Sequence, residues 1–172
     1  MPDILDSLEP YFAKVNEHDE AKLDELHAIF QEHFMDKPLY LDGKLVSVKR
    51  HVYNPKKDGL PDYFAHYFEK FVHIVSRTID TKKSDKQREF RSERANRIHW
   101  IRPILDNYHD PRISNFRFLE SDGSIRDYFW FKAKDFMVVM EEVKPDYYLI
   151  TGFCVDHQNK RYYAKKEANR IK

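Results

Sequence analysis

The feature that most constrains the fold is a change of hydrophobic periodicity at Arg112. From this residue on, apolar and polar residues alternate with a period of two, which is typical of β-strands with one buried face. Short, turn-forming separators divide this part of the chain into four strand-like runs: RISNFRFL, SIRDYFWFK, DFMVVMEEV and DYYLITGFCV. Separators this short join neighbouring strands that run in opposite directions. The sequence therefore predicts a four-stranded antiparallel meander sheet.

The residues before the sheet have helical periodicity. Apolar residues recur every three or four positions in residues 3–16 and again in 18–34, which predicts an antiparallel helical pair. The run LYLDGKLVSVKRHVY then predicts a short hairpin turned at Asp-Gly, and the loop NPKKDGLPD follows it. We place a boundary at this loop, between an N-terminal region of residues 1–54 and a second region of residues 55–172.

The chain ends in HQNKRYYAKKEANRIK, which predicts a basic C-terminal helix that covers a face or an edge of the sheet. Helices that precede a run of consecutive strands indicate the α+β class. We therefore expect N-terminal helices packed on a four-stranded antiparallel meander sheet, with the basic helix added at the end.

A helix predicted over residues 63–79 has an unusual polar face. Apolar residues line one side, and the other side carries His66, Lys70, His73 and Arg77. Such a row is either a solvated surface or a surface that binds a phosphodiester while an imidazole moves protons near neutral pH. A zinc site at the two histidines is the weaker interpretation, because the lysine between them repels a cation.

Arg94 lies inside the apolar face of a second predicted helix, residues 85–105. Phe90, Arg94 and Ile98 form an i, i+4, i+8 ladder, so the guanidinium points to the core side of that helix. A guanidinium keeps its charge and needs an anionic partner, which is either a carboxylate of the protein or a phosphate. Trp100 projects away from the apolar stripe, where it either packs on another element or stacks on a base.

The charge of the chain is balanced overall and segregated locally. Thirty Lys and Arg oppose 29 Asp and Glu, which leaves +1, so no global basic field indicates nucleic acid. Basic residues gather between positions 82 and 102, which makes this segment the expected anion-binding part: Lys82, Lys83, Lys86, Arg88, Arg91, Arg94, Arg97 and Arg102.

The remaining composition narrows the compartment and the chemistry. The single cysteine, Cys154, excludes an internal disulfide and a Cys-based zinc site and indicates a reducing cytoplasm. No apolar run is long enough for a membrane span, and the start MPDILDSLEP is unlike a signal peptide. A Gly-rich phosphate loop, GxSxG and HExxH are absent, which argues against nucleotide-driven, serine-hydrolase and zinc-protease functions. We expect a cytoplasmic protein that does not bind membranes.

Four segments together resemble a known family of nucleases. FVHIVSRT, RANRIHWIRPIL, YYLITGF and YYAKK occur in that order, around an antiparallel meander. This arrangement resembles the phage-associated branch of the barnase, EndoU, colicin and RelE-like ribonucleases, the BECR fold. The similarity covers about residues 56–172, and its most specific part is the Arg-x-x-Arg-Ile-x-Trp core at residues 94–100. The N-terminal helical pair lies outside it.

The resemblance implies an α+β fold and a metal-independent endoribonuclease that needs no cofactor. The family's histidine falls on His73, its arginine pair on Arg94 and Arg97, and its strand hydroxyl on Thr151. RNA carries its own nucleophile, the 2′-hydroxyl, so the enzyme supplies a base, cations for the phosphorane and an acid for the leaving 5′-oxygen. We expect further substrate contacts from the polar row and the indole: Arg77, Lys70, His66 and Trp100.

Two points stay open in this assignment. The second proton-transfer group is one of Glu93, Tyr148 and His99. In addition, His73 and Arg94 can meet only if the sheet edge and the later helix lie against the polar face of the earlier helix.

Two functions remain possible from the sequence. One is a ribonuclease, either a toxin or a protein of phage–host conflict, that cuts RNA to a 2′,3′-cyclic phosphate. The other is a non-catalytic module on the same fold that binds RNA or a protein, with its arginines held structurally. RNA is the expected partner; an antitoxin or immunity protein, and a homodimer formed through the N-terminal helices, are left open.

Overall fold

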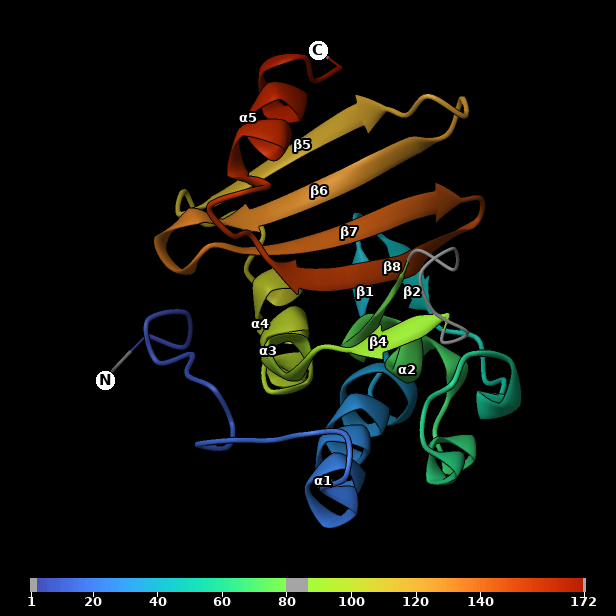
Figure 1. Cartoon of the computed structure of the whole chain (residues 1–172). Helices are drawn as coiled ribbons and strands as arrows, with labels where there is room; N and C mark the ends of the chain where they lie inside the picture. The colour runs from blue at the N-terminus through green and yellow to red at the C-terminus, as the bar shows by residue number, and fades with distance from the viewer. Residues whose placement is uncertain (1–2, 80–86, 172) are drawn as a thin grey trace.

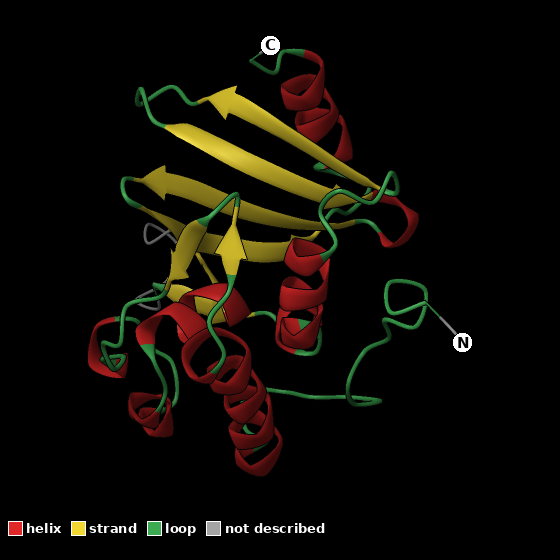
Figure 2. Cartoon of the chain, turned by 180° about the vertical axis from the view of Figure 1, so that it is seen from behind, coloured by secondary structure: helices red, strands yellow, loops and turns green. Residues whose placement is uncertain are grey.

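One twisted sheet with helices on both faces organises the molecule (Figures 1 and 2). The structure, a computed structural model, describes residues 3–79 and 87–171. The α-helices are α1 (Glu20–Gln31), α2 (Glu69–Val75), α3 (Ser92–Ala95), α4 (Ile101–Asp106) and α5 (Lys160–Ala168). Shorter helical segments are η1 (Glu32–Asp36), η2 (Pro55–Lys57), η3 (Asp62–His66), η4 (Ile98–Trp100) and η5 (Lys132–Lys134). The strands are β1 (Tyr40–Leu41), β2 (Lys44–Ser47), β3 (Ser76–Thr78), β4 (Arg88–Phe90), β5 (Ile113–Leu119), β6 (Ile125–Phe131), β7 (Phe136–Val143) and β8 (Asp146–Cys154).

The prediction of a four-stranded antiparallel meander sheet is wrong. The main sheet has six strands in the order β1-β2-β8-β7-β6-β5, and β2 pairs with β8 in parallel. The four alternating runs do form β5 to β8, and β1 and β2 extend the sheet from the N-terminal region. The sheet is therefore mixed.

The Asp-Gly hairpin explains why the sheet is larger than expected. Asp42 and Gly43 have φ of 49° and 77°, the geometry of a type I′ turn that joins β1 to β2. The hairpin places Val46 and Ser47 beside Tyr147 and Tyr148 of β8. The sequence predicts the hairpin, but parallel pairing with a strand about 100 residues away leaves no local signal.

The two faces of the sheet bury different apolar clusters. The main core contains Phe131, Phe136 and Leu149 from the sheet together with apolar residues of α1, α2 and α4. The smaller cluster, around Phe116 and Phe153, lies on the opposite face. Tyr163 of α5 packs on this smaller cluster, so the predicted basic C-terminal helix covers one face of the sheet (Figure 1).

The predicted helix over residues 63–79 is interrupted twice. It begins as the 3-10 segment η3, continues as α2 and ends as the strand β3. At the first break, the backbone N–H of Phe68 donates to Nε2 of His27 at 3.0 Å, and that of Glu69 donates to the His51 carbonyl at 2.7 Å. These tertiary hydrogen bonds replace helical ones, so tertiary contacts override the local periodicity.

The predicted helix over residues 85–105 is also wrong as a continuous element. Residues 80–86 lie outside the described part of the chain, and Arg88–Phe90 form β4, which pairs antiparallel with β3. The helical part is divided into α3, η4 and α4. Phe90 and Arg94 therefore do not lie on one helical ladder, and Arg94 belongs to the single turn of α3.

Residues 3–16 do not form the predicted helix and consist of turns and extended chain. The amide of Asn96 accepts a hydrogen bond from the Phe12 N–H and donates one to the Phe12 carbonyl, both at 2.7 Å. Nε1 of Trp100 donates to the Glu9 carbonyl at 3.0 Å. These contacts satisfy the backbone of the extended segment, so its apolar side chains reach the core without a helix.

The predicted boundary near residue 54 divides the sequence but not the core. Leu5, Leu26 and Val46 from the first region share one cluster with Phe71 and Leu149 from the second. The N-terminal region therefore contributes to the main core and, through β2, to the main sheet. Independent folding of residues 55–172 stays a prediction.

Candidate functional site

A row of cationic side chains meets at Ser76, the buried first residue of β3. The Ser76 carbonyl accepts hydrogen bonds from Nη2 of Arg88 and Nη1 of Arg94, both at 3.2 Å. The Ser76 hydroxyl accepts from Nε of Arg88 at 2.9 Å and donates to the Val72 carbonyl. Arg88 also donates to the carbonyl of His73 at 3.2 Å. Ser76 thus holds the guanidinium groups of Arg88, from β4, and Arg94, from α3, at the carboxyl end of α2.

Arg94 has no carboxylate within ion-pair distance among residues 3–79 and 87–171. Its guanidinium lies 5.7 Å from the ring centroid of Phe153, a cation–π contact, and makes one hydrogen bond, to Ser76. Burial and the neighbouring Arg91 lower the pKa of Arg94, although an arginine stays protonated at neutral pH. The other N–H groups of this half-buried cation remain available to an external anion.

Neighbouring arginines are paired in a different way. Arg77 contacts Glu89 at 3.0 Å, and Arg91 contacts Glu93 at 2.6 Å. Carboxylates are therefore present on this surface, and Glu93 acts on Arg94 through its charge without forming a direct ion pair with it. The alternative of a structural ion pair at Arg94, left open by the sequence, does not occur among the described residues.

His73 lies on α2, and its carbonyl accepts the hydrogen bond from Arg88. Its half-buried ring meets the edge of Tyr53, with ring centroids 6.0 Å apart. Burial, assisted by the nearby Arg88, lowers the pKa of His73 from its ordinary value of 6.5. The imidazole is therefore mainly neutral at pH 7 and able to accept a proton. His73 and Arg94 are linked through Arg88 and Ser76, and no direct contact joins their side chains.

Lys70 connects α2 to the outer edge of β8. Its ammonium donates to the Ile150 carbonyl at 3.3 Å. Burial lowers the pKa of Lys70, and the nearby Lys49, Arg126 and Arg88 act in the same direction. Lys70 also lines a cavity of about 200 Å³ between β2, α2 and β8. Lys70 thus brings the polar side of α2 into contact with β8 beyond the end of its pairing with β2.

Thr151 shares a face of β8 with the ring on which Arg94 lies. Thr151 pairs with Val139 and Phe153 pairs with Met137, and both partners belong to the smaller cluster. Because alternate residues of a strand share a face, the Thr151 side chain lies on the same face as Phe153. The register of β7 and β8 shifts near Val139, which leaves Ile150 unpaired at a bulge. Thr151 therefore lies between the Lys70 contact and the Arg94 contact.

Gly152, the residue after Thr151, packs closely against two core side chains. A Cβ at Gly152 would lie 2.8 Å from Cδ1 of Ile101 and 3.3 Å from Cζ of Phe136. A side chain of α4 therefore occupies the space next to Gly152. Any contribution to a ligand at this point comes from Thr151.

Arg97 and Trp100 lie on the other side of α3. Nη1 of Arg97 donates to the Glu93 carbonyl at 3.0 Å, and its guanidinium lies 5.2 Å from the Trp100 ring centroid. Trp100 is 4% exposed and packs edge-on against Phe136. The packing alternative is thus the one observed for Trp100, because a buried ring offers no face to a base.

The remaining predicted substrate contacts are more distant. Arg77 is exposed on β3 in its pair with Glu89, and His66 is exposed at the end of η3. Lys70 and Arg94 contact β8 at Ile150 and Phe153, on either side of Thr151, and Arg88 and Ser76 link His73 to Arg94. Trp100 and His66 lie apart from these contacts, and Arg97 bonds to the Glu93 carbonyl. The sequence does not identify Ser76 and Arg88 as the residues that connect the cations. Their contact depends on the pairing of β3 with β4, in which Ser76 lies opposite Phe90 and Thr78 opposite Arg88.

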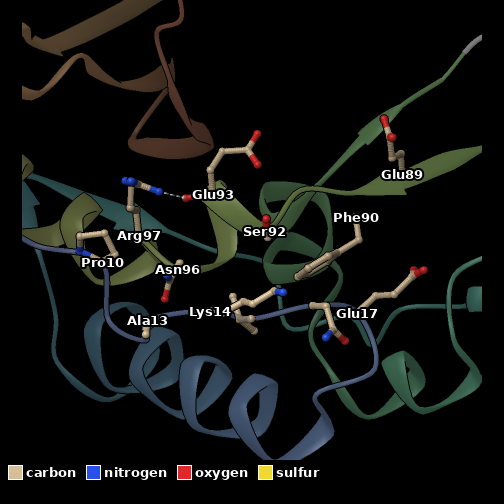
Figure 3. A pocket seen from close by; sticks show the side chains of 12 residues that line it. Pro10, Ala13, Lys14, Glu17, Glu89, Phe90, Ser92, Glu93, Asn96 and Arg97 are labelled. Carbon is tan, nitrogen blue, oxygen red and sulfur yellow. Dashed lines mark hydrogen bonds between the residues drawn. The ribbon is translucent and has the colours of Figure 1, made fainter.

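A pocket of about 650 Å³ lies between the N-terminal segment and the β4–α3 connection (Figure 3). Phe90 and Lys14 point toward its middle, whereas Glu89 points away, and Arg97 turns back to the Glu93 carbonyl (Figure 3). The pocket mixes acidic and basic side chains, and His73 and Thr151 do not line it. We therefore place the candidate site on the α2–β8 surface.

Comparison with protein-family models, with curated proteins and with solved structures finds no match to this chain. Within the described ranges, no helix has the combined length and apolar character that crossing a bilayer requires. Functional assignment therefore depends on the site itself.

Proposed function

We propose that the protein is a metal-independent endoribonuclease that binds an RNA phosphodiester against β8, between Arg94 and Thr151. The observation that carries the proposal is the half-buried Arg94 guanidinium, which forms no ion pair with a carboxylate among the described residues and lies over Phe153, two residues from Thr151 on the same face of β8. A desolvated cation of this kind is stabilised by a phosphate that enters the surface. The resemblance to BECR nucleases points to the same residues.

His73 supplies the proton acceptor in this proposal. Since burial lowers its pKa, the imidazole remains neutral at pH values where an exposed histidine is charged. A neutral imidazole can remove the proton of the ribose 2′-hydroxyl. Cleavage that depends on His73 should therefore retain its rate to a pH below 6.5 and decline as the pH falls through the lowered pKa.

The reaction follows from the substrate's own nucleophile. As the 2′-oxygen loses its proton, it forms a bond to phosphorus, and the bond from phosphorus to the leaving 5′-oxygen breaks. The products are a 2′,3′-cyclic phosphate and a 5′-hydroxyl, which receives one proton from an acid. Arg94 opposes the negative charge that grows on the phosphorane, and the Thr151 hydroxyl donates to a nonbridging oxygen.

The three candidates for the second proton-transfer group differ in their contacts. Glu93 is bound to Arg91, and His99 is hydrogen-bonded to the Glu9 carbonyl at 2.7 Å. Tyr148 instead lines the cavity beside Lys70. We therefore favour Tyr148 as the second proton-transfer group, because no ion pair of the kind seen at Glu93 holds it among the described residues.

Cleavage of a mixed-sequence RNA in the presence of EDTA tests the proposal. We expect the wild type to cut RNA and leave cyclic phosphate ends. His73→Ala should lose about 100- to 10,000-fold in rate, the range expected for removal of a general base. Arg94→Ala should also lose activity, because the phosphorane loses its cation.

Two matched variants serve as controls. His18 is exposed and lies in the turn before α1, and Arg170 is exposed near the chain end, so His18→Ala and Arg170→Ala should keep wild-type activity. Thermal unfolding of each variant separates lost chemistry from lost folding. If RNA binds but stays uncut by the folded wild type, the non-catalytic binding module replaces the nuclease.

A further inference from the structure

The cavity between β2, α2 and β8 lies outside the predicted catalytic set and has the chemistry of an anion site. It is lined by basic and aromatic side chains that include Lys49, His51, Lys70 and Tyr148. We propose that this cavity binds a second phosphate of the RNA strand, adjacent to the phosphodiester at Arg94. This inference rests on the proposed function and names the part of the substrate that the site reads.

The cavity exists because two parallel strands separate. Pairing of β2 with β8 ends at Ser47 and Tyr148. Beyond this point β8 continues through Ile150, whereas the segment after β2 turns away at Val48 and Lys49. The hollow of about 200 Å³ between them is large enough for a phosphate group with part of a sugar. Its position follows from strand geometry, so it is a fixed feature of the fold.

Lys70 is the central cation of the cavity. It makes one hydrogen bond, to the Ile150 carbonyl, and has no carboxylate within ion-pair distance among the described residues. The half-buried Lys44, by contrast, contacts Glu142 at 3.0 Å. Like Arg94, Lys70 is thus a partly desolvated cation whose charge the protein does not neutralise by a direct ion pair.

The charges around Lys70 favour an anion. Lys49, His51 and Glu69 line the same cavity, and Arg88 and Arg126 lie close enough to lower the Lys70 pKa. Glu69 acts in the opposite direction and is exposed at the start of α2. Cations exceed this one carboxylate, so an entering phosphate is attracted to the cavity and favours the charged form of Lys70.

The spacing along β8 connects the cavity to the Arg94 site. Lys70 binds at Ile150, and Arg94 lies over Phe153 three residues further on, which is about 10 Å at the rise of a β-strand. Thr151 lies between them. One RNA backbone laid along this part of β8 would place two consecutive phosphates near two separate cations.

Binding of short ligands that cannot be cleaved tests the second phosphate site independently of catalysis. The ligands are a 2′-deoxy trinucleotide with two phosphates and its two analogues in which one linkage is a neutral methylphosphonate. Affinity is measured by calorimetry over a range of salt concentrations. For the wild type, we expect either neutral linkage to weaken binding.

Lys70→Met keeps the apolar stem of the side chain and removes the charge. We expect weaker binding of the trinucleotide and a salt slope of log K that is smaller by about 0.7, the value for one phosphate contact in a single strand. In Lys70→Met, one of the two methylphosphonate analogues should then bind as tightly as the trinucleotide. Lys49→Met, at an exposed position where folding is not at risk, should change affinity in the same direction. Lys37→Met is the control, because Lys37 is exposed and paired with Glu32 at 2.7 Å.

The outcomes separate this inference from the proposed nuclease. Wild-type affinity and salt slope in Lys70→Met would overturn the second phosphate site. Equal losses for the trinucleotide and both analogues would also overturn it, since the contribution of Lys70 to binding would then depend on neither phosphate. A wild type that cuts no RNA but discriminates between the ligands as described retains the second phosphate site and loses the nuclease.

Discussion

Arg112 and Arg94 differ in the groups that surround their positive charge. Arg112, at the start of β5, is held by Asp3 at 2.9 Å and by Asp6 and Asp110, both at 2.8 Å. Arg94 has a backbone carbonyl and an aromatic ring in place of carboxylates. The acidic cluster around Arg112 neutralises its cation with charges from the protein. At Arg94 no carboxylate forms an ion pair among the described residues, and we propose that an external phosphate neutralises this cation.

We infer that Arg112 stabilises the fold, and we propose that Arg94 binds substrate. Arg112 connects the N-terminal segment to the sheet, because Asp3 and Asp6 precede α1 and Asp110 precedes β5. Its bonds are complete without any ligand. Arg94, Arg88 and Lys70 bond to backbone carbonyls, which orient a cation without cancelling its charge. The comparison therefore predicts that mutations in the two environments affect different measurements.

The largest expected effect comes from exchanging each arginine for an isosteric neutral residue. Arg94→Gln should lower RNA cleavage by about 100- to 1,000-fold, as loss of one preorganised donor does in other active sites, and should leave folding nearly unchanged. Arg112→Gln should keep the cleavage rate per folded molecule and lower the unfolding temperature. Initial cleavage rates and thermal melts of both variants check the pair. If Arg112→Gln lowered cleavage as strongly as Arg94→Gln, the proposed separation of roles would be wrong.

An intermediate effect is expected at Gly152, where β8 rests on α4. An alanine Cβ would lie within 3.0 Å of Ile101, whose side chain is fully buried, so strand and helix must move apart. We expect Gly152→Ala to destabilise the protein by about 1–3 kcal/mol, as overpacked cores do. The displacement should also weaken RNA binding, because Thr151 and Phe153 flank this residue.

Gly43→Ala is the matched control for that experiment in one respect, the available space. No atom lies within 4 Å of a Cβ at Gly43, although its φ of 77° is unfavourable for alanine. Gly43→Ala should therefore lower stability through the turn and leave RNA affinity unchanged. Urea unfolding and ligand titration distinguish the two variants, and unchanged stability of Gly152→Ala would show that the β8–α4 contact can relax.

The sequence predicts the parts of this fold whose signals are local. Alternation with a period of two identifies β5 to β8, and Asp-Gly identifies the β1–β2 turn. The longer helical predictions fail where distant groups take over the backbone hydrogen bonds, as His27 does at Phe68 and Asn96 does at Phe12. Parallel pairing of β2 with β8 is equally invisible in the sequence, so the sheet is larger than expected.

The candidate site shows the same division. Charge patterns select His73, Arg94 and Lys70, which the structure places near one strand. They do not identify Ser76 as the residue that joins the cations, because its role depends on the β3–β4 hairpin. Trp100 illustrates the opposite case, in which a residue type suited to base stacking is used for packing.

The smallest expected effect is a difference in acid sensitivity between the two environments. Hydrogen bonds from Arg112 lower the pKa of Asp110 to about 2 and lower that of Asp3 from its ordinary 3.8. Carboxylates with a lowered pKa stabilise the fold above pH 3.8, and this contribution is lost as the pH falls through about 2. Stability of the wild type should therefore decrease between about pH 4 and pH 2. Arg112→Gln should flatten that decrease, whereas Arg94→Gln, with no carboxylate partner to release, should keep the wild-type slope. Urea unfolding across this pH range measures both slopes, and an Arg94→Gln slope as flat as that of Arg112→Gln would show that Arg94 is neutralised by a protein carboxylate after all.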